Sequence, residues 1–433
     1  MKLPKFIRGN LLLKMTSLNA TVIGARLIIS LFIQRLLAEI VGEAGIAKIG
    51  SLRNLSQLLT SFSSIGIFNG IVKYVAEYKT DGEKLQKLFS TTLVFSVLGS
   101  LVTGLVLFFS ATFLSEYLFA STEFDYLIQL IAITVPFICF QRIFNGVING
   151  LSEYKKFAKI DLISYVLSAG LTVWFLLEYN IDGALVAIAL TPIIQLTVLL
   201  VIFFSVLKDY IQFSKLTFKM PMAKSLLAFS MMSFFSTVLL NYVEIDIRSM
   251  ITDKITQSDA GVWTAMTFIS KNYMVFSGSI LTLYVLPKFS GIYTETEFKK
   301  ELFNIFKTLL PLFGIGMILV YLFRNLIIQL IYPDFVSMAP LFKWQLLGDF
   351  VRLASIIIAH QFLAKKMVRN FIFSEVISLG LFFGMAYWFT DIYGIEGVVI
   401  AHFLRYIFYF FIVTFLVWRY FRNNREKPEN VGA

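Results

Sequence analysis

Long apolar runs dominate this sequence and constrain what the chain can fold into more than any other feature. Runs of about 20 apolar residues recur along its length, and most charged residues lie between them. Hydrophobic residues make up 58% of the 433 residues, charged residues only 15%, and the mean hydropathy is +0.77. A globular protein in water has no interior that could bury this much apolar surface. Because the strands of a membrane barrel would alternate in polarity, continuous runs predict an all-α polytopic membrane protein.

About twelve transmembrane helices are expected. The first six lie near 13–38, 46–72, 88–112, 126–150, 160–178 and 183–206. The second six lie near 225–250, 259–286, 303–331, 341–364, 370–390 and 397–418. Prolines 136, 192 and 311 fall inside these ranges, where a kink is tolerated if neighbouring groups satisfy the freed carbonyls.

Basic residues alternate from one side of the predicted helices to the other. The N-terminus, each even-numbered loop and the C-terminal tail carry three or four Lys or Arg residues, whereas the odd-numbered loops carry few. Since basic residues accumulate in cytoplasmic loops, this pattern predicts a multi-pass protein of the bacterial inner membrane with both termini in the cytoplasm. It also explains the net charge of +11 without a nucleic-acid partner. The basic N-terminus lacks a cleavage site, so it is expected to start the first helix rather than to be a signal peptide.

An internal repeat divides the helices into two sets of six. Residues 179–190 read YNIDGALVAIAL and residues 393–404 read YGIEGVVIAHFL, an offset of 214 residues. At the same offset, the segment 161–164 matches 375–378 in an acid, two aliphatic residues and a serine. We therefore predict a duplicated six-helix unit, with an N-terminal lobe over 1–212 and a C-terminal lobe over 213–433. Such halves rock about a central substrate site in many transporters.

Cations outnumber acids within the predicted helices. Ten cations lie within these helices or at their ends. Three of them, Arg35, Arg324 and Lys343, are expected to reach outward to the membrane surface. Charges at membrane depth are costly and normally face a protein interior or a water-filled cavity. The sequence therefore predicts an electropositive cavity between the halves that binds an anion such as a diphosphate. Its candidate residues are Arg26, Arg53, Arg142, Arg248, Lys271, Arg352 and Arg405. The alternative is that these cations form scattered structural ion pairs, as the three-residue spacing of Asp349 and Arg352 would allow.

A few intramembrane groups could couple transport to an ion gradient. Buried carboxylates can bind protons near neutral pH, and histidine titrates in the same range. The candidates are Asp349, Glu375, Glu244, Asp246 and His402. A histidine within a helix is more often structural, so His402 and His360 are the weaker candidates.

No feature of the sequence points to catalysis. There is no GxxxxGK[ST] phosphate loop, no Ser/His/Asp constellation and no long external loop to house an active site. One cysteine and two histidines are too few for a zinc site, so neither a metal nor a cofactor is expected.

Several segments are similar to known transporters. The segment 66–70 (GIFNG) followed by 73–78 (KYVAEY) resembles the end of helix two in Wzx-type polysaccharide flippases. Segments 284–287 (YVLP) and 344–349 (WQLLGD), then Ala364-Lys365 and Ser374-Glu375, resemble further parts of these proteins in the same order. The likeness spans the whole chain and is strongest to flippases of enterobacterial common antigen (lipid III), in the multidrug/oligosaccharidyl-lipid/polysaccharide exporter superfamily.

The resemblance implies a twelve-helix, two-lobed flippase that alternates between inward-open and outward-open states. Its implied substrate is an undecaprenyl-diphosphate oligosaccharide, of the kind used to build O-antigen or common antigen. A proton or sodium ion would drive it, and a polysaccharide polymerase and chain-length proteins are candidate partners. Arginines at 26, 35, 53, 248 and 352 match cations of the family, Lys271 stands where an acid can occur, and Arg405 is not clearly shared.

Other functions remain open at this point. A multidrug exporter of the same superfamily would favour an acidic cavity, which the cation surplus opposes. A lipid II flippase would be expected to have two more helices. A membrane polysaccharide polymerase or glycosyltransferase would need an external loop or an acidic catalytic motif. A scaffold protein would not need so many intramembrane charges.

Overall fold

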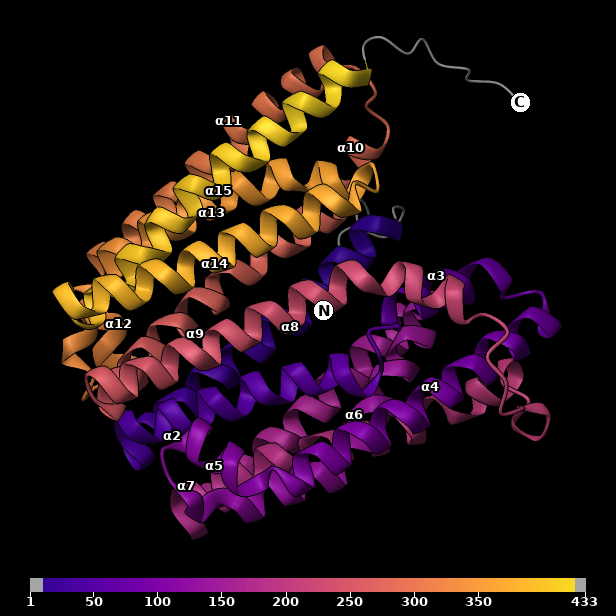
Figure 1. Ribbon diagram of the computed structural model, residues 1–433, viewed down its shortest axis with the longest axis horizontal. Coiled ribbons are helices and arrows are strands. Elements are labelled where there is room, and N and C mark those ends of the chain that lie inside the picture. The colour runs from indigo at the N-terminus through magenta and orange to yellow at the C-terminus, as the bar shows by residue number, and fades with distance from the viewer. Residues whose placement is uncertain (1–10, 425–433) are drawn as a thin grey trace. The chain divides into compact units, whose positions relative to one another are not determined.

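The structure, a computed structural model, describes residues 11–424 of the chain. All regular structure in that range is helical (Figure 1). The α-helices of the first half are α2 (Leu11–Ser63), α3 (Phe68–Tyr78), α4 (Gly82–Phe109), α5 (Ala111–Phe119), α6 (Asp125–Gly150) and α7 (Tyr154–Tyr210). Those of the second half are α8 (Ala223–Lys254), α9 (Gln257–Ile280), α10 (Leu286–Ser290), α11 (Glu295–Leu322), α12 (Arg324–Ile331), α13 (Leu341–Ala364), α14 (Val368–Tyr393) and α15 (Ile395–Asn424).

The described helices supply the twelve membrane passes that the sequence predicts. Non-helical backbone at Gly42 divides α2 into two passes, and Asn180 divides α7 in the same way. The other passes are α4, α6, α8, α9 with α10, α11, α13, α14 and α15. Seven described helices meet length and hydropathy criteria for crossing a membrane on their own. The fold class is therefore confirmed as an all-α polytopic membrane protein.

Side-chain caps and prolines mark the helices as the sequence leads one to expect. Asp81 caps α4 by accepting a hydrogen bond from the backbone N–H of Lys84 (3.0 Å), and this bond holds the pKa of the exposed carboxyl below its usual value. Thr256 and Thr294 cap α9 and α11 in the same manner. Prolines 136, 192 and 311 lie inside α6, α7 and α11, as predicted.

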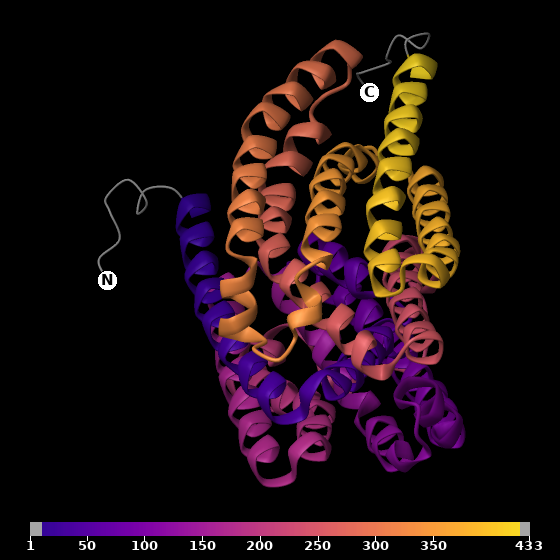
Figure 2. The same cartoon turned by 90° about the vertical axis from the view of Figure 1, so that its left-hand side faces the viewer.

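The contacts divide the chain into two compact units, Met1–Ile245 and Asp246–Ala433. In unit 1, α6 packs against α3, α4 and α7, and a buried core forms from side chains such as Ile71, Leu88 and Phe203. In unit 2, α15 packs against α13 and α14, and α13 also contacts α11; these long helices run nearly along one direction (Figure 2). The division falls inside α8, whereas the predicted lobe boundary near residue 212 lies before it. The assignment of the whole seventh helix to the second lobe therefore stays a prediction.

The internal repeat is confirmed in the backbone. Asn180 (φ 52°, ψ −132°) and its repeat partner Gly394 (φ 58°, ψ −141°) adopt the same rare conformation between two helices. Three residues further on, Gly183 and Gly397 approach a carbonyl so closely that an added Cβ would lie 2.0 Å from Phe175 O and 2.2 Å from Phe389 O, respectively. Both turns therefore depend on glycine at the same repeat position.

The second and ninth predicted helices are less regular than expected. The range 46–72 is interrupted between α2 and α3, where Ile65 (φ 49°) and Gly66 (φ 66°) leave the helical region. Here Gly99 of α4 packs on the carbonyl of Ser63, and the thiol of the buried Cys139 donates a hydrogen bond to that oxygen (3.2 Å). The range 303–331 is likewise broken at Phe323, between α11 and α12. Tertiary contacts, which the apolar pattern does not encode, explain the first break.

Candidate functional site

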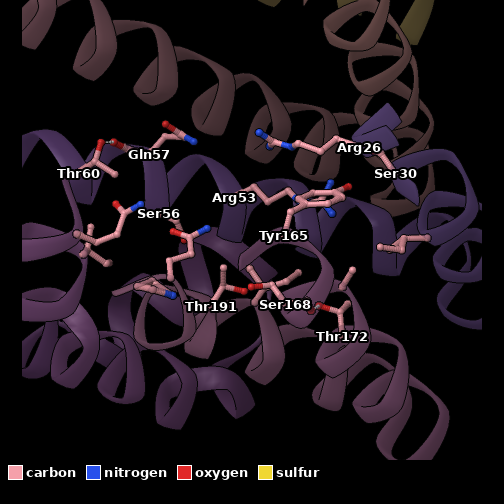
Figure 3. A pocket seen from close by; sticks show the side chains of 17 residues that line it. Arg26, Ser30, Arg53, Ser56, Gln57, Thr60, Tyr165, Ser168, Thr172 and Thr191 are labelled. Carbon is pink, nitrogen blue, oxygen red and sulfur yellow. Dashed lines mark hydrogen bonds between the residues drawn. The ribbon is translucent and has the colours of Figure 1, made fainter. Parts of the chain in front are cut away.

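A polar pocket lies within unit 1 at membrane depth, between α2, α6 and α7 (Figure 3). Its volume is about 360 Å³, near the lower end for ligand pockets, so it suits part of a large ligand. Most of its lining residues are polar: Arg26, Ser30, Arg53, Ser56, Gln57, Thr60, Gln141, Tyr165, Ser168, Thr172, Thr191 and Gln195. Polar groups of this density within hydrocarbon-spanning helices are expensive unless they serve a ligand or each other.

Two of the predicted cations, Arg26 and Arg53, line this pocket together. Arg26 Nη1 donates a hydrogen bond to Asp161 Oδ2 of α7 (2.7 Å), and its guanidinium lies 4.7 Å from the centre of the Tyr165 ring. This ion pair is of the kind that the alternative prediction, structural pairing of the cations, describes. Figure 3 shows Arg26, Arg53 and Tyr165 grouped on one side of the pocket, with Gln57 and Thr60 further along the same wall as Arg53.

The remaining polar lining is neutral. The hydroxyls of Thr172 and Thr191 donate to helix carbonyls four residues earlier (2.8 and 3.1 Å), which leaves their oxygens free to accept. Among the described residues, the buried Ser168 hydroxyl has no hydrogen-bond partner. The side-chain amides of Gln57, Gln141 and Gln195, which we call the amide face, likewise have none in the described part of the chain. This pocket therefore offers unused donors and acceptors.

A second polar cluster is built around Asp349 in unit 2. The carboxylate is fully buried, and Ser270 of α9 (2.5 Å), Tyr273 of α9 and Gln345 of α13 (3.1 Å) all donate hydrogen bonds to its Oδ2. His402 Nε2 of α15 lies 3.1 Å from Oδ1. Arg352 Nη1 is 3.7 Å from the same oxygen, so the pair suggested by the three-residue spacing does form. Asp349, on α13, thus forms polar contacts with both α9 and α15.

His402 Nε2 lies within hydrogen-bond distance of one acceptor and one donor. It is 3.1 Å from the acceptor Oδ1 of Asp349 and 3.2 Å from the donor Nε2 of Gln345. A protonated Nε2 can donate to the carboxylate, and a bare Nε2 can accept from the amide, but one nitrogen cannot do both at once. Gly348 makes room for the ring, because a Cβ there would lie 2.5 Å from His402 Cδ2. The ring can therefore keep one hydrogen bond with or without this proton.

The other predicted cations lie in different surroundings. Arg142 stacks on the Phe68 ring (3.8 Å to its centre) and does not line the unit 1 pocket. Arg248 is buried and donates to the Thr264 hydroxyl (2.8 Å). Arg405, also buried, donates to the Ser378 hydroxyl (2.9 Å) and lies near the Tyr406 ring. Lys271 of α9 is exposed.

The remaining predicted acids also have local partners. Glu375 accepts a hydrogen bond from Tyr409 (2.8 Å) within unit 2, and Glu244 accepts one from Asn54 (2.6 Å) within unit 1. Asp246 lies on α8, two residues further on. No cluster of three or more His, Cys, Asp or Glu that could hold a metal occurs among residues 11–424.

Several residues of these sites escaped the sequence analysis. The amide face, Tyr165 and the pocket hydroxyls are uncharged, and the partners of Asp349 on α9 are ordinary helix residues. The only available signal was helical spacing: Arg53, Gln57 and Thr60 recur every three or four residues on one face of α2. That spacing would have identified one wall of the pocket.

The chain is similar to two curated proteins called lipid III flippase, from Escherichia coli (strain K12) and Shigella flexneri. Each is 26% identical over 397 residues, which cover 90% of this chain and 94% of the relative.

Among solved structures, an inward-facing multidrug resistance transporter of the MATE family, in the MOP superfamily, superposes with a TM-score of 0.76. It is 14% identical, and the match covers 91% of this chain and 95% of the transporter. The lipid II flippase MurJ in an inward closed conformation gives 0.75 at 18% identity, over 92% of this chain and 87% of MurJ. These two likenesses show a shared fold.

A family model matches the larger part of the chain. It is the model described as polysaccharide biosynthesis protein, and it covers residues 27–336, which include every lining residue of the unit 1 pocket except Arg26 and extend past α12 of unit 2. The twelve-pass fold, the internal repeat and this match agree, and the chain belongs to the polysaccharide biosynthesis protein family.

Proposed function

We propose that this protein is a flippase that moves an undecaprenyl-diphosphate-linked oligosaccharide from the cytoplasmic to the periplasmic leaflet by alternating access. The observation that carries the proposal is the polar pocket of unit 1, where Arg26 and Arg53 accompany neutral hydrogen-bonding groups at membrane depth. A glycan diphosphate cannot cross hydrocarbon unaided, but such a surface can replace its water while the polyprenyl tail stays in lipid. The relatives named lipid III flippase support the same activity.

The orientation follows from the charge pattern. We place the protein in the bacterial inner membrane with both termini in the cytoplasm, because the basic segments then all face the cytoplasm. The direct test of the activity is purified protein in proteoliposomes that hold a fluorescent undecaprenyl-diphosphate glycan. Protein-dependent movement of the probe between leaflets supports a flippase, and movement of a cationic dye alone would favour a multidrug exporter.

Charge reversal in the pocket should abolish this transport. Arg53→Glu places a carboxylate where the proposal needs a diphosphate partner, so flipping of the lipid-linked glycan should fall at least tenfold, as about 1.4 kcal/mol of lost attraction already would cause. Flux in proteoliposomes measures it, and monodisperse elution in detergent checks folding. Lys79→Glu, an exposed C-cap of α3, is the matched charge reversal outside the pocket. Normal flux in a well-folded Arg53→Glu protein would remove Arg53 from the substrate site.

We further propose that a proton gradient drives the cycle through His402 and Asp349. The two possible partners of His402 Nε2 give the ring a hydrogen bond in either protonation state. The groups that face His402 are Asp349, Gln345, Arg352 and Tyr406, with Arg405 one turn along α15. Arg352 lies 3.7 Å from the Asp349 carboxylate, and its positive charge opposes a sodium ion at the same carboxylate. Protonation would thus change which residue of α13 His402 binds, Gln345 or Asp349, without leaving the ring unpaired.

Replacing His402 by glutamine tests this coupling. The glutamine amide can still donate to Asp349 but cannot take up a proton, so the protein should fold while an imposed pH gradient no longer accelerates flipping. His360→Gln is the control, since His360 lies on α13 with its Nδ1 on its own helix carbonyl (2.8 Å). An undiminished response to the pH gradient in His402→Gln, or acceleration by a sodium gradient alone, would contradict the proposal.

A further inference from the structure

We propose that the amide face of the unit 1 pocket, Gln57, Gln141 and Gln195, binds the sugar ring next to the diphosphate and so selects the glycan. This inference rests on the proposed flippase function and adds the groups that would recognise the carbohydrate. The three glutamines are uncharged, so the search for intramembrane charges in the sequence did not identify them. The ligand class is a pyranose carried on a lipid diphosphate.

The first argument is the arrangement along α2. Arg53, Gln57 and Thr60 follow one another on one face of the helix, and all three line the pocket (Figure 3). Seven residues of α-helix span about 10 Å. A diphosphate held at Arg53 therefore places the attached sugar beside the part of the wall that carries Gln57 and Thr60.

The second argument is the match in hydrogen bonding. Each sugar hydroxyl both donates and accepts, and a side-chain amide does the same through its NH₂ and C=O groups. The hydroxyls of Thr172 and Thr191 already donate hydrogen bonds to helix carbonyls, so they serve mainly as acceptors. Ser168 and the three amides are among the unused neutral donors of the described pocket. A site that hydrogen-bonds a hydroxyl discriminates strongly against a ligand that lacks it.

The third argument is that the three amides come from three separate elements. Gln57 lies on α2, Gln141 on α6 and Gln195 on the second half of α7. A ring in the pocket would therefore be contacted from several directions, which fixes its orientation. A cationic drug would gain little here, because Arg53 repels it and no carboxylate is among the lining residues described.

The test compares two lipids on the purified full-length protein in nanodiscs. One probe is undecaprenyl diphosphate, and the other is the same lipid carrying one N-acetylglucosamine. Wild type should bind the glycosylated probe more tightly. In Gln141→Leu and Gln195→Leu, this sugar-dependent gain should shrink about tenfold each, as expected for one lost hydrogen bond in a desolvated site. Gln129→Leu is the control, because it makes the same change on α6 outside the pocket.

The possible outcomes distinguish failure of the proposed sugar site from failure of the proposed flippase function. Loss of the gain in the pocket variants but not in Gln129→Leu supports a sugar site at the amide face. An unchanged gain, or equal weakening of both probes, overturns it while the flippase proposal stands. If wild type binds neither probe, the flippase proposal itself fails and the sugar site fails with it. Thermal unfolding of each variant identifies any that lost binding by misfolding.

Discussion

Asp349→Ala is expected to lower the unfolding temperature strongly. The substitution leaves the hydroxyls of Ser270 and Tyr273 and the Gln345 amide without their acceptor in a site that excludes water. It also leaves Arg352 without its carboxylate partner. Breaking a buried ion pair by removing one partner typically costs about 3–5 kcal/mol, and each orphaned donor adds to this.

Thermal unfolding of the detergent-solubilised protein, followed by tryptophan fluorescence, measures the loss. Asp349→Asn is the informative companion, because it keeps the shape and one acceptor oxygen and should fall between alanine and wild type. Glu396→Ala is the matched control, since that carboxylate lies at the start of α15 and accepts one hydrogen bond, from Trp344 (2.8 Å). An unfolding temperature of Asp349→Ala equal to that of the control would show that the cluster contributes nothing to stability.

Gly183→Ala and Gly397→Ala should each prevent normal folding of the turn in which they lie. An added methyl would lie 2.0 Å from Phe175 O or 2.2 Å from Phe389 O, and neither backbone carbonyl can move without disrupting a helix end. We expect a cost of about 3 kcal/mol or more at either site, at the upper end for overpacking. Because the two glycines are repeat partners, their effects should be alike.

Two other glycines provide matched controls. Gly170 in α7 and Gly380 in α14 have open space where a Cβ would be, so alanine there should leave the unfolding temperature unchanged or slightly raised. The comparison uses the fraction of monodisperse protein after extraction and its unfolding temperature. Wild-type values for either Gly183→Ala or Gly397→Ala would mean that the turns tolerate a side chain and that the repeat has not preserved a steric requirement.

The general fold could be predicted because each helix that crosses a bilayer needs a run of about 20 apolar residues. Apolar runs, the breaks near Gly42 and Asn180, and the repeat all appear in local sequence, and the structure has them where expected. The interruption at Ile65 and Gly66 could not be predicted in this way, since it depends on α4 packing against the carbonyl of Ser63.

The sites were harder to predict, for a related physical reason. Charges in apolar runs identified Arg26, Arg53 and Asp349 as unusual, but their partners are remote in sequence. Arg26 pairs with a residue 135 positions away, and Asp349 meets α9 and α15 at separations of 79 and 53. Helix packing decides these meetings, and one sequence does not specify it. Uncharged residues such as Gln141 gave no signal at all.

The buried Cys139 has a practical consequence for following this protein at work. It is the only cysteine, it lies fully inside unit 1, and its thiol is occupied by the carbonyl of Ser63. Water-soluble maleimides therefore have no native target on the folded chain. Any cysteine introduced for a fluorophore or spin label will report its own surroundings, and the native residue need not be replaced. Conformational changes of the protein can thus be followed with introduced labels while the contact between Cys139 and Ser63, at the break after α2, stays intact.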